Sequence, residues 1–176
     1  VIRPTVENLE GLTRTGHIGI FATPGTVRSE TYELEIAKLY GDRMTVVSEA
    51  CPMWVPLVEN HEHESEGADY FVRQHVEHIL RRDPQIDCIL LGCTHYPLLE
   101  EKIRRHLPSG VHVVSQGHYV AASLQDYLHR HSEMESRLTR GGTMQFLTTD
   151  KAETFAESAA VFMGGPVAQA SRVSLG

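Results

Sequence analysis

The chain of 176 residues lacks several features that would place it in a broad class of proteins. It has no apolar run near the roughly 18 residues of a membrane-spanning helix, and no charged and then apolar leader of the signal-peptide kind. Its three cysteines, Cys51, Cys88 and Cys93, form no CxxC pair. An odd number at irregular spacing is typical of a reducing compartment rather than of a disulfide framework. We therefore expect a cytoplasmic protein with no membrane partner.

Positive charge is also scarce. Sixteen Lys and Arg residues face 23 Asp and Glu residues, which gives a net charge of −7 with neutral histidines. No basic patch is visible, and this argues against nucleic acid as the main partner. The chain also lacks an initiator methionine and starts at Val1 in what reads as mid-domain sequence. We expect a fragment that holds one full domain and part of another.

Short apolar segments alternate with amphipathic ones along the chain. Strands are predicted at 17–22, 44–47, 87–91, 111–114, 145–148 and 173–175. Helices are predicted at 26–40, 67–81, 97–107, 121–130 and 150–162, and 132–142 reads as a polar linker. Strands separated by helices of about ten or more residues indicate βαβ units. The predicted fold class is therefore α/β with a mostly parallel sheet.

The densest chemistry follows the apolar run that ends at Leu91. Residues 92–99 read Gly-Cys-Thr-His-Tyr-Pro-Leu-Leu. Proline disfavours a helical conformation in the residue before it and favours the first helical position, so Tyr96 is the predicted N-cap and Pro97 the first helical residue. Cys93, Thr94 and His95 would then form a loop at the carboxyl end of a strand, where parallel sheets bind ligands.

The helix N-terminus and an imidazolium at His95 would both favour an anion and a thiolate at this loop. Cys93 is then a candidate acid, base or nucleophile. The alternative is a small buried cysteine at a strand end, since cysteine is among the most buried residue types.

Three further segments carry candidate residues. The hydroxyls of the loop Thr23–Ser29 either contact a polar ligand, or Thr26 caps the helix that follows. The apolar loop 50–59 ends in Glu59, which either orients a histidine near a cleft or is a solvated carboxylate. Residues 61–64 read His-Glu-His-Glu. Helix neighbours two apart do not face each other, and no third ligand is signalled by spacing. We therefore expect a solvated loop and no metal.

Residues 92–99 resemble the second cysteine motif of the glutamate racemases, in the aspartate/glutamate racemase superfamily. Residues 19–29 (GIFATPGTVRS), 50–59 (ACPMWVPLVE) and 146–150 (FLTTD) are similar to that family in order and spacing. The resemblance implies a three-layer, parallel-sheet racemase domain at 1–115. It also implies that 116–176 returns to complete a first domain. One departure is Ser115-Gln116, where many members have an aspartate.

The same resemblance implies cofactor-independent interconversion of L- and D-glutamate by two cysteines. Cys93 would be the one that serves L-glutamate. Thr94 and His95 would bind substrate, and His95, oriented by Glu59, would assist proton transfer at Cys93. The opposing cysteine belongs to an Ala-Cys-Asn-Thr motif that these 176 residues lack, and Cys51 and Cys88 are poor substitutes.

The implied biological role is supply of D-glutamate for peptidoglycan. The implied partners are glutamate and the missing N-terminal half, with a homodimer also open. We expect the fragment alone to be inactive. We also expect its last 60 or so residues to pack imperfectly around a set of uncovered apolar side chains: Phe146, Leu147, Phe155, Val161 and Phe162.

Other functions stay open on the residues alone. A racemase or decarboxylase of another α-acid would use the same cysteine chemistry, although His95 followed by Tyr-Pro favours glutamate over aspartate-type relatives. A non-catalytic carboxylate-binding domain would use the same loop. A cysteine hydrolase would accumulate a covalent intermediate on Cys93.

Overall fold

The computed structural model describes residues 2–167 and 170–175, which form two compact units. The first unit is Val1–Tyr127 and the second is Leu128–Gly176. Helix α7 (Gly117–Arg130) begins in the first unit, where Tyr119 packs on the core. The predicted division near residue 115 concerns the domains of a longer protein, and it stays a prediction.

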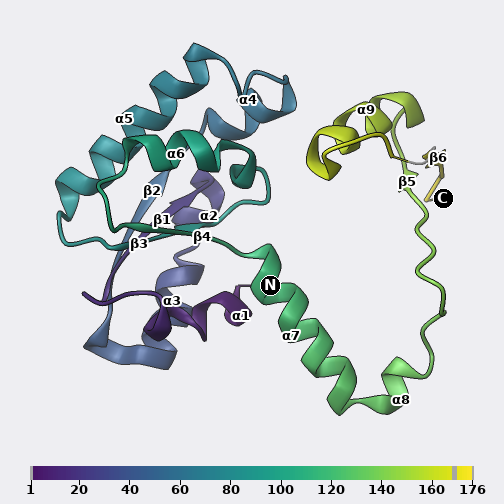
Figure 1. The fold of residues 1–176 in the computed structure, drawn as a ribbon, viewed down its shortest axis with the longest axis horizontal. Helices are drawn as coiled ribbons and strands as arrows, with labels where there is room; N and C mark the ends of the chain where they lie inside the picture. The colour runs from purple at the N-terminus through teal and green to yellow at the C-terminus, as the bar shows by residue number, and fades with distance from the viewer. Residues whose placement is uncertain (1, 168–169, 176) are drawn as a thin grey trace. The chain divides into compact units, whose positions relative to one another are not determined.

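The first unit is built on a four-stranded parallel sheet (Figure 1). Its strands are β1 (His17–Ala22), β2 (Thr45–Ala50), β3 (Cys88–Leu91) and β4 (His112–Ser115), in the order β2-β1-β3-β4. The fold class predicted from the sequence is confirmed. Because all four strands run the same way, their carboxyl ends, and the loops that follow them, lie at one edge of the sheet.

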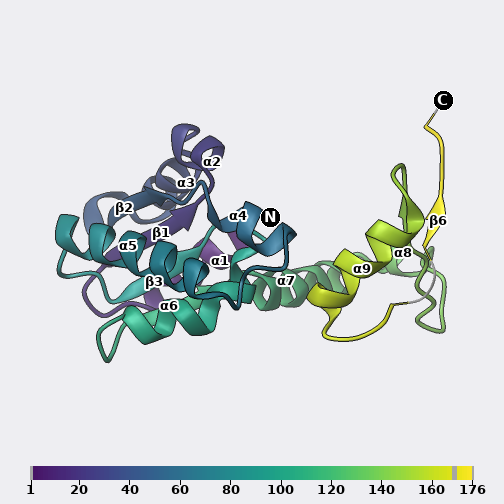
Figure 2. The ribbon, with the colours of Figure 1, turned by 90° about the horizontal axis from the view of Figure 1, so that it is seen from above.

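Helices cover both faces of this sheet, as Figures 1 and 2 show. Helices α4 (Trp54–Glu59), α5 (Glu66–Arg82) and α6 (Glu100–His106) share one core cluster with Phe21 and Ile89. Helices α1 (Arg3–Val6) and α3 (Thr31–Tyr40) share the other with Ile20 and Leu90. Neighbouring strand residues point to opposite faces, which produces the three-layer arrangement.

The prediction of one continuous helix at 26–40, capped by Thr26, is wrong. The chain forms two helices, α2 (Pro24–Arg28) and α3, separated by Glu30 at φ 50°. Thr23, not Thr26, is the N-cap: its side chain accepts a hydrogen bond from the Thr26 N–H at 3.3 Å. Pro24 then occupies the first helical position, which suits its fixed φ.

Two other boundaries also differ from expectation. The segment predicted as an apolar loop, 50–59, contains helix α4 from Trp54 to Glu59. Tyr96 is not an N-cap: it begins a 3₁₀ turn, η3 (Tyr96–Leu99), with His95 before it, and the α-helix α6 starts only at Glu100. Short 3₁₀ turns η1 (Leu9–Gly11) and η2 (Gly41–Arg43) complete the first unit.

A buried carboxylate fixes the segment that leads into β1. Asp87 accepts hydrogen bonds from the Arg14 N–H at 2.8 Å, the Thr15 N–H at 3.2 Å and the Thr15 hydroxyl at 2.9 Å. The Thr13 hydroxyl donates to it as well. Burial acts to raise the pKa of Asp87, but these hydrogen bonds outweigh it and hold the pKa below its usual range.

The second unit is small and loosely covered. It contains α8 (Ser132–Glu135) within the predicted linker, then β5 (Leu147–Thr148), α9 (Ala152–Met163) and β6 (Ser171–Arg172). Strands β5 and β6 pair in parallel. The strand predicted at 173–175 begins two residues earlier in the structure, at Ser171. None of the five apolar residues expected to be uncovered is buried. No helix in the described residues is long and apolar enough to cross a membrane.

Candidate active site

The close approach of β3 to β1 places the cysteine motif. The Gly92 N–H donates to the Phe21 carbonyl at 2.7 Å. A Cβ at Gly92 would lie 3.0 Å from that carbonyl oxygen, 3.1 Å from the Ala22 Cβ and 3.2 Å from the Tyr32 ring. Only glycine therefore fits without displacing its neighbours. The chain leaves the sheet at this point and presents Cys93 beyond it.

Three side chains form a connected chain of polar contacts at this edge. The His95 Nδ1 lies 3.8 Å from the Cys93 Sγ, and the His95 Nε2 lies 2.5 Å from the Glu59 Oε1. An ionised carboxylate can only accept, so the Nε2 carries the proton it donates to Glu59. In the neutral imidazole the Nδ1 is then an acceptor, directed at the Cys93 thiol.

Thr94 also belongs to this group, since its hydroxyl lies 3.3 Å from the His95 Nδ1. The structure thus brings together all four residues predicted from the sequence: Cys93, Thr94, His95 and Glu59. Cys93 is half-buried and Glu59 is half-exposed. The group is therefore open to a ligand from solvent while His95, 21% exposed, stays held between its partners.

An aromatic cluster joins helix α4, which carries Glu59, to the turn that follows His95. Trp54, in the first turn of α4, packs against Tyr96 with ring centroids 4.8 Å apart and against Phe21 at 4.9 Å. The Tyr96 hydroxyl donates to the Cys51 carbonyl at 3.1 Å. These buried contacts tie the helix that carries Glu59 to the turn that follows His95. No local pattern in the sequence predicts these contacts, because they join residues more than 30 positions apart.

The other two cysteines are unsuited to acid–base chemistry. Cys51 and Cys88 are both buried. Burial raises the pKa of the Cys51 thiol far above its usual range, and it raises the pKa of Cys88 to about 12. Both therefore remain neutral thiols at physiological pH, and Cys93 is the one cysteine of the three that is not buried.

The hydroxyl-rich segment Thr23–Ser29, which contains helix α2, follows β1 at the same edge. Its hydroxyls are engaged locally: Thr23 Oγ1 and Thr26 Oγ1 lie 3.0 Å apart, and Ser29 donates to the Thr26 carbonyl at 2.7 Å. The segment does contain a helix cap, but the predicted cap, Thr26, is wrong, because Thr23 caps α2. Residues 61–64 lie in turns between α4 and α5, and the described residues contain no group of three or more ligands that could hold a metal ion.

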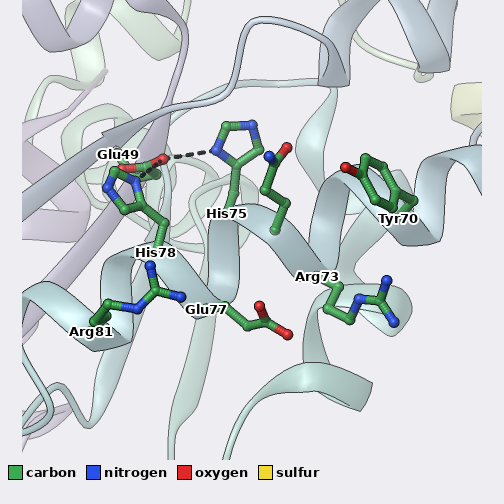
Figure 3. Close-up of a pocket in the computed structure, with 8 residues that line it drawn as sticks. Glu49, Tyr70, Arg73, His75, Glu77, His78 and Arg81 are labelled. Atoms are coloured by element: carbon green, nitrogen blue, oxygen red, sulfur yellow. Dashed lines mark hydrogen bonds and ion pairs between the residues drawn. The ribbon is translucent and has the colours of Figure 1, made fainter.

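A separate pocket of about 560 Å³ lies beside α5 (Figure 3). Glu49, near the end of β2, accepts hydrogen bonds at 2.8 Å from the Nδ1 atoms of both His75 and His78. Burial acts to raise the pKa of Glu49, but the hydrogen bonds and charges of the two histidines outweigh it and lower the pKa. Arg82 adds a contact at 3.4 Å. This cluster holds α5 to β2.

The chain is similar to known proteins along nearly its whole length. The model of the Asp/Glu/hydantoin racemase family matches residues 2–124. The glutamate racemase of Bacillus cereus is 37% identical over 175 residues, which are 99% of this chain and 64% of that protein. The crystal structure of glutamate racemase RacE1 from Bacillus anthracis has a TM-score of 0.85 at 30% identity and covers 99% of this chain and 63% of its own.

The Thermus thermophilus glutamate racemase, solved in complex with β-chloro-D-alanine, has a TM-score of 0.77 at 27% identity. It covers 99% of this chain, and the match spans 61% of its own length. The chain thus spans a little under two thirds of the relatives that it matches.

Proposed function

The chain belongs to the Asp/Glu/hydantoin racemase family, and from this premise we propose that the protein of which it is part interconverts L- and D-glutamate. The observation that carries the proposal is the contact chain from Glu59 through His95 to Cys93. It supplies a thiol with a proton acceptor beside it, at the edge of the sheet where ligands bind. The glutamate racemases of two Bacillus species are similar along nearly the whole chain.

Racemisation requires a proton to leave one face of Cα and another to arrive on the opposite face. In the proposed mechanism Cys93, as a thiolate, removes the α-proton of L-glutamate. His95 first accepts the thiol proton at Nδ1, and Glu59 stabilises the resulting imidazolium through Nε2. In the reverse direction the Cys93 thiol delivers its proton to the planar carbanion. Because thiols supply both steps, the reaction proceeds without a cofactor.

A second acid–base group must face Cys93 across the substrate. Cys51 and Cys88 are buried within the first unit, so neither can reach the opposite face. We propose that the opposing cysteine lies in a part of the protein outside these 176 residues, since the match leaves 36% of the Bacillus cereus protein and 37% of the Bacillus anthracis chain uncovered. The chain alone is then half of an active site.

The Thr94 hydroxyl and the loop N–H groups would bind the substrate carboxylate. The Thermus relative holds a D-amino-acid analogue, β-chloro-D-alanine, in keeping with an amino-acid substrate for this family. D-Glutamate made by the complete protein would serve peptidoglycan synthesis in the cytoplasm.

The proposal is tested by incubating the full protein encoded by its gene with L-glutamate in D₂O. Early in the reaction, D-glutamate should carry deuterium at Cα while the remaining L-glutamate stays unlabelled, because separate groups remove and deliver the proton. Chiral chromatography with mass detection measures both. Absence of D-glutamate, or product that keeps its original proton, would refute the two-base proposal. The 176-residue chain alone should show no turnover near the ~1 s⁻¹ typical of slow enzymes.

A further inference from the structure

The side chain of Gln116 bridges two groups beside the cysteine motif. Gln116 lies between β4 and α7, and its carbonyl accepts from the Val120 N–H at 3.1 Å. Its Nε2 donates to the Leu91 carbonyl at 3.0 Å and to the Tyr32 hydroxyl at 2.7 Å. Leu91 is the last residue of β3, two positions before Cys93. One amide group therefore joins the end of β3 to the first turn of α3.

The orientation of this amide follows from its partners. The Leu91 carbonyl can only accept a hydrogen bond, so the Nε2 of Gln116 must face it. The Oε1 is then buried and has no hydrogen-bond partner. An unsatisfied buried acceptor is destabilising, and an apolar side chain of the same size would avoid this cost. The two donated hydrogen bonds therefore determine how the Gln116 amide is oriented.

Both partners of Gln116 hold the backbone that leads to Cys93. The Tyr32 ring lies so close to Gly92 that a Cβ there would be 3.2 Å from it. On its other side Gly92 is held by its N–H bond to Phe21. Burial raises the pKa of Tyr32 to about 12, although the hydrogen bond from Gln116 acts to lower it, so the Tyr32 hydroxyl stays neutral.

We propose that Gln116 is a positioning residue for Cys93. By clamping Leu91 and Tyr32 it fixes the Leu91–Gly92 backbone and so sets the distance from the Cys93 thiol to His95. It does not touch the reacting atoms. The inference rests on the proposed function for its catalytic consequence, but its geometric part concerns the thiol alone. A displacement of about 1 Å at a reacting group costs on the order of 100-fold in rate.

The geometric part is tested on the 176-residue chain without substrate. Gln116→Met keeps the length of the side chain and removes the donor, and Gln125→Met, at an exposed position in α7, is the matched control. Iodoacetamide should modify Cys93 and spare the buried Cys51 and Cys88. The rate of Cys93 alkylation against pH reports the thiolate and its surroundings: His95, Glu59 behind it, and Tyr32.

We expect Q116M to change the alkylation rate at neutral pH at least about threefold and to move the midpoint of the profile, with Q125M unchanged. Tyr32→Phe keeps the ring against Gly92 and leaves the hydrogen bond from Gln116 to Leu91 in place. It should therefore change the alkylation rate less than Q116M does. Identical profiles for Q116M and Q125M would overturn the proposal. A lower melting temperature of Q116M with an unchanged profile would also overturn it, because the role would then be structural only.

The catalytic part is tested on the full protein with glutamate deuterated at Cα. The two enantiomers have equal free energy, so kcat/KM must fall equally for both, by about 10- to 100-fold in Q116M. Only L-glutamate transfers its deuteron to Cys93, so the primary isotope effect should rise with labelled L-glutamate and not with labelled D-glutamate. Unchanged isotope effects in both directions would contradict the proposal. If the wild-type protein does not racemise glutamate, the proposed function fails, while the alkylation result still decides the role of Gln116.

Discussion

Replacement of Glu49 by glutamine should weaken the contacts that hold helix α5 to strand β2 and so lower the stability of the fold. Glu49 is almost fully buried and accepts two 2.8 Å hydrogen bonds, one from His75 and one from His78. A hydrogen bond to a charged group contributes about 1.5–3 kcal/mol. The His78 side chain is 53% exposed, so its share is reduced by solvent screening, whereas that of His75 is 14% exposed and counts nearly in full. We therefore expect E49Q to lower the free energy of unfolding by about 2 kcal/mol at neutral pH.

The dependence of this loss on pH gives the sharper test. The pKa of Glu49 is lowered in the folded protein, so its stabilisation is present above the unfolded pKa of about 4.5 and is lost as pH falls through the folded value. The difference between wild type and E49Q should therefore shrink towards zero in acid. Urea unfolding followed by the fluorescence of Trp54, the sole tryptophan and part of this core, and by circular dichroism measures it. Glu77→Gln, an exposed change in the same pocket, is the control. A difference that persists undiminished at pH 3, or an equal loss in E77Q, would refute the reasoning.

Two further substitutions test the supports of the site. Gly92→Ala should cost about 1–3 kcal/mol of stability through crowding against Phe21 and Tyr32, and should lower racemase activity of the full protein more than tenfold. Gly11→Ala, which has open space around it, should change neither the stability nor the activity.

Asp87→Asn should lower the free energy of unfolding by about 2–3 kcal/mol near neutral pH. That loss should fade below about pH 4, because the lowered pKa of Asp87 stabilises the fold only above its unfolded value; a pH-independent loss in urea unfolding would contradict it.

The sequence predicted the parallel sheet and the cysteine motif because their signals are local. The run that ends at Leu91 is apolar and short, and Gly92 to His95 follow it directly. Buried strands of a parallel sheet read in this way, and their carboxyl ends place the loop without further information.

The remaining features depend on contacts between distant residues. The sequence predicts an apolar loop at 50–59, but the chain forms helix α4 there, which packs through Trp54 on Tyr96. The break at Glu30 has no glycine or proline to signal it. Gln116 meets Tyr32 across 84 positions. No periodicity or spacing reports such pairs, and only the folded chain shows them.

The central claim is that Cys93 exchanges the α-proton of glutamate. Its most direct test is the racemisation rate of the full protein carrying Cys93→Ala, measured beside Cys51→Ala in the same assay. An acid–base group contributes about 10²- to 10⁴-fold to the rate, so C93A should lose at least 100-fold in both directions. C51A changes a thiol that burial keeps neutral. Its folded fraction should therefore retain the activity of the wild-type protein. Activity of C93A within a few-fold of wild type would contradict the account.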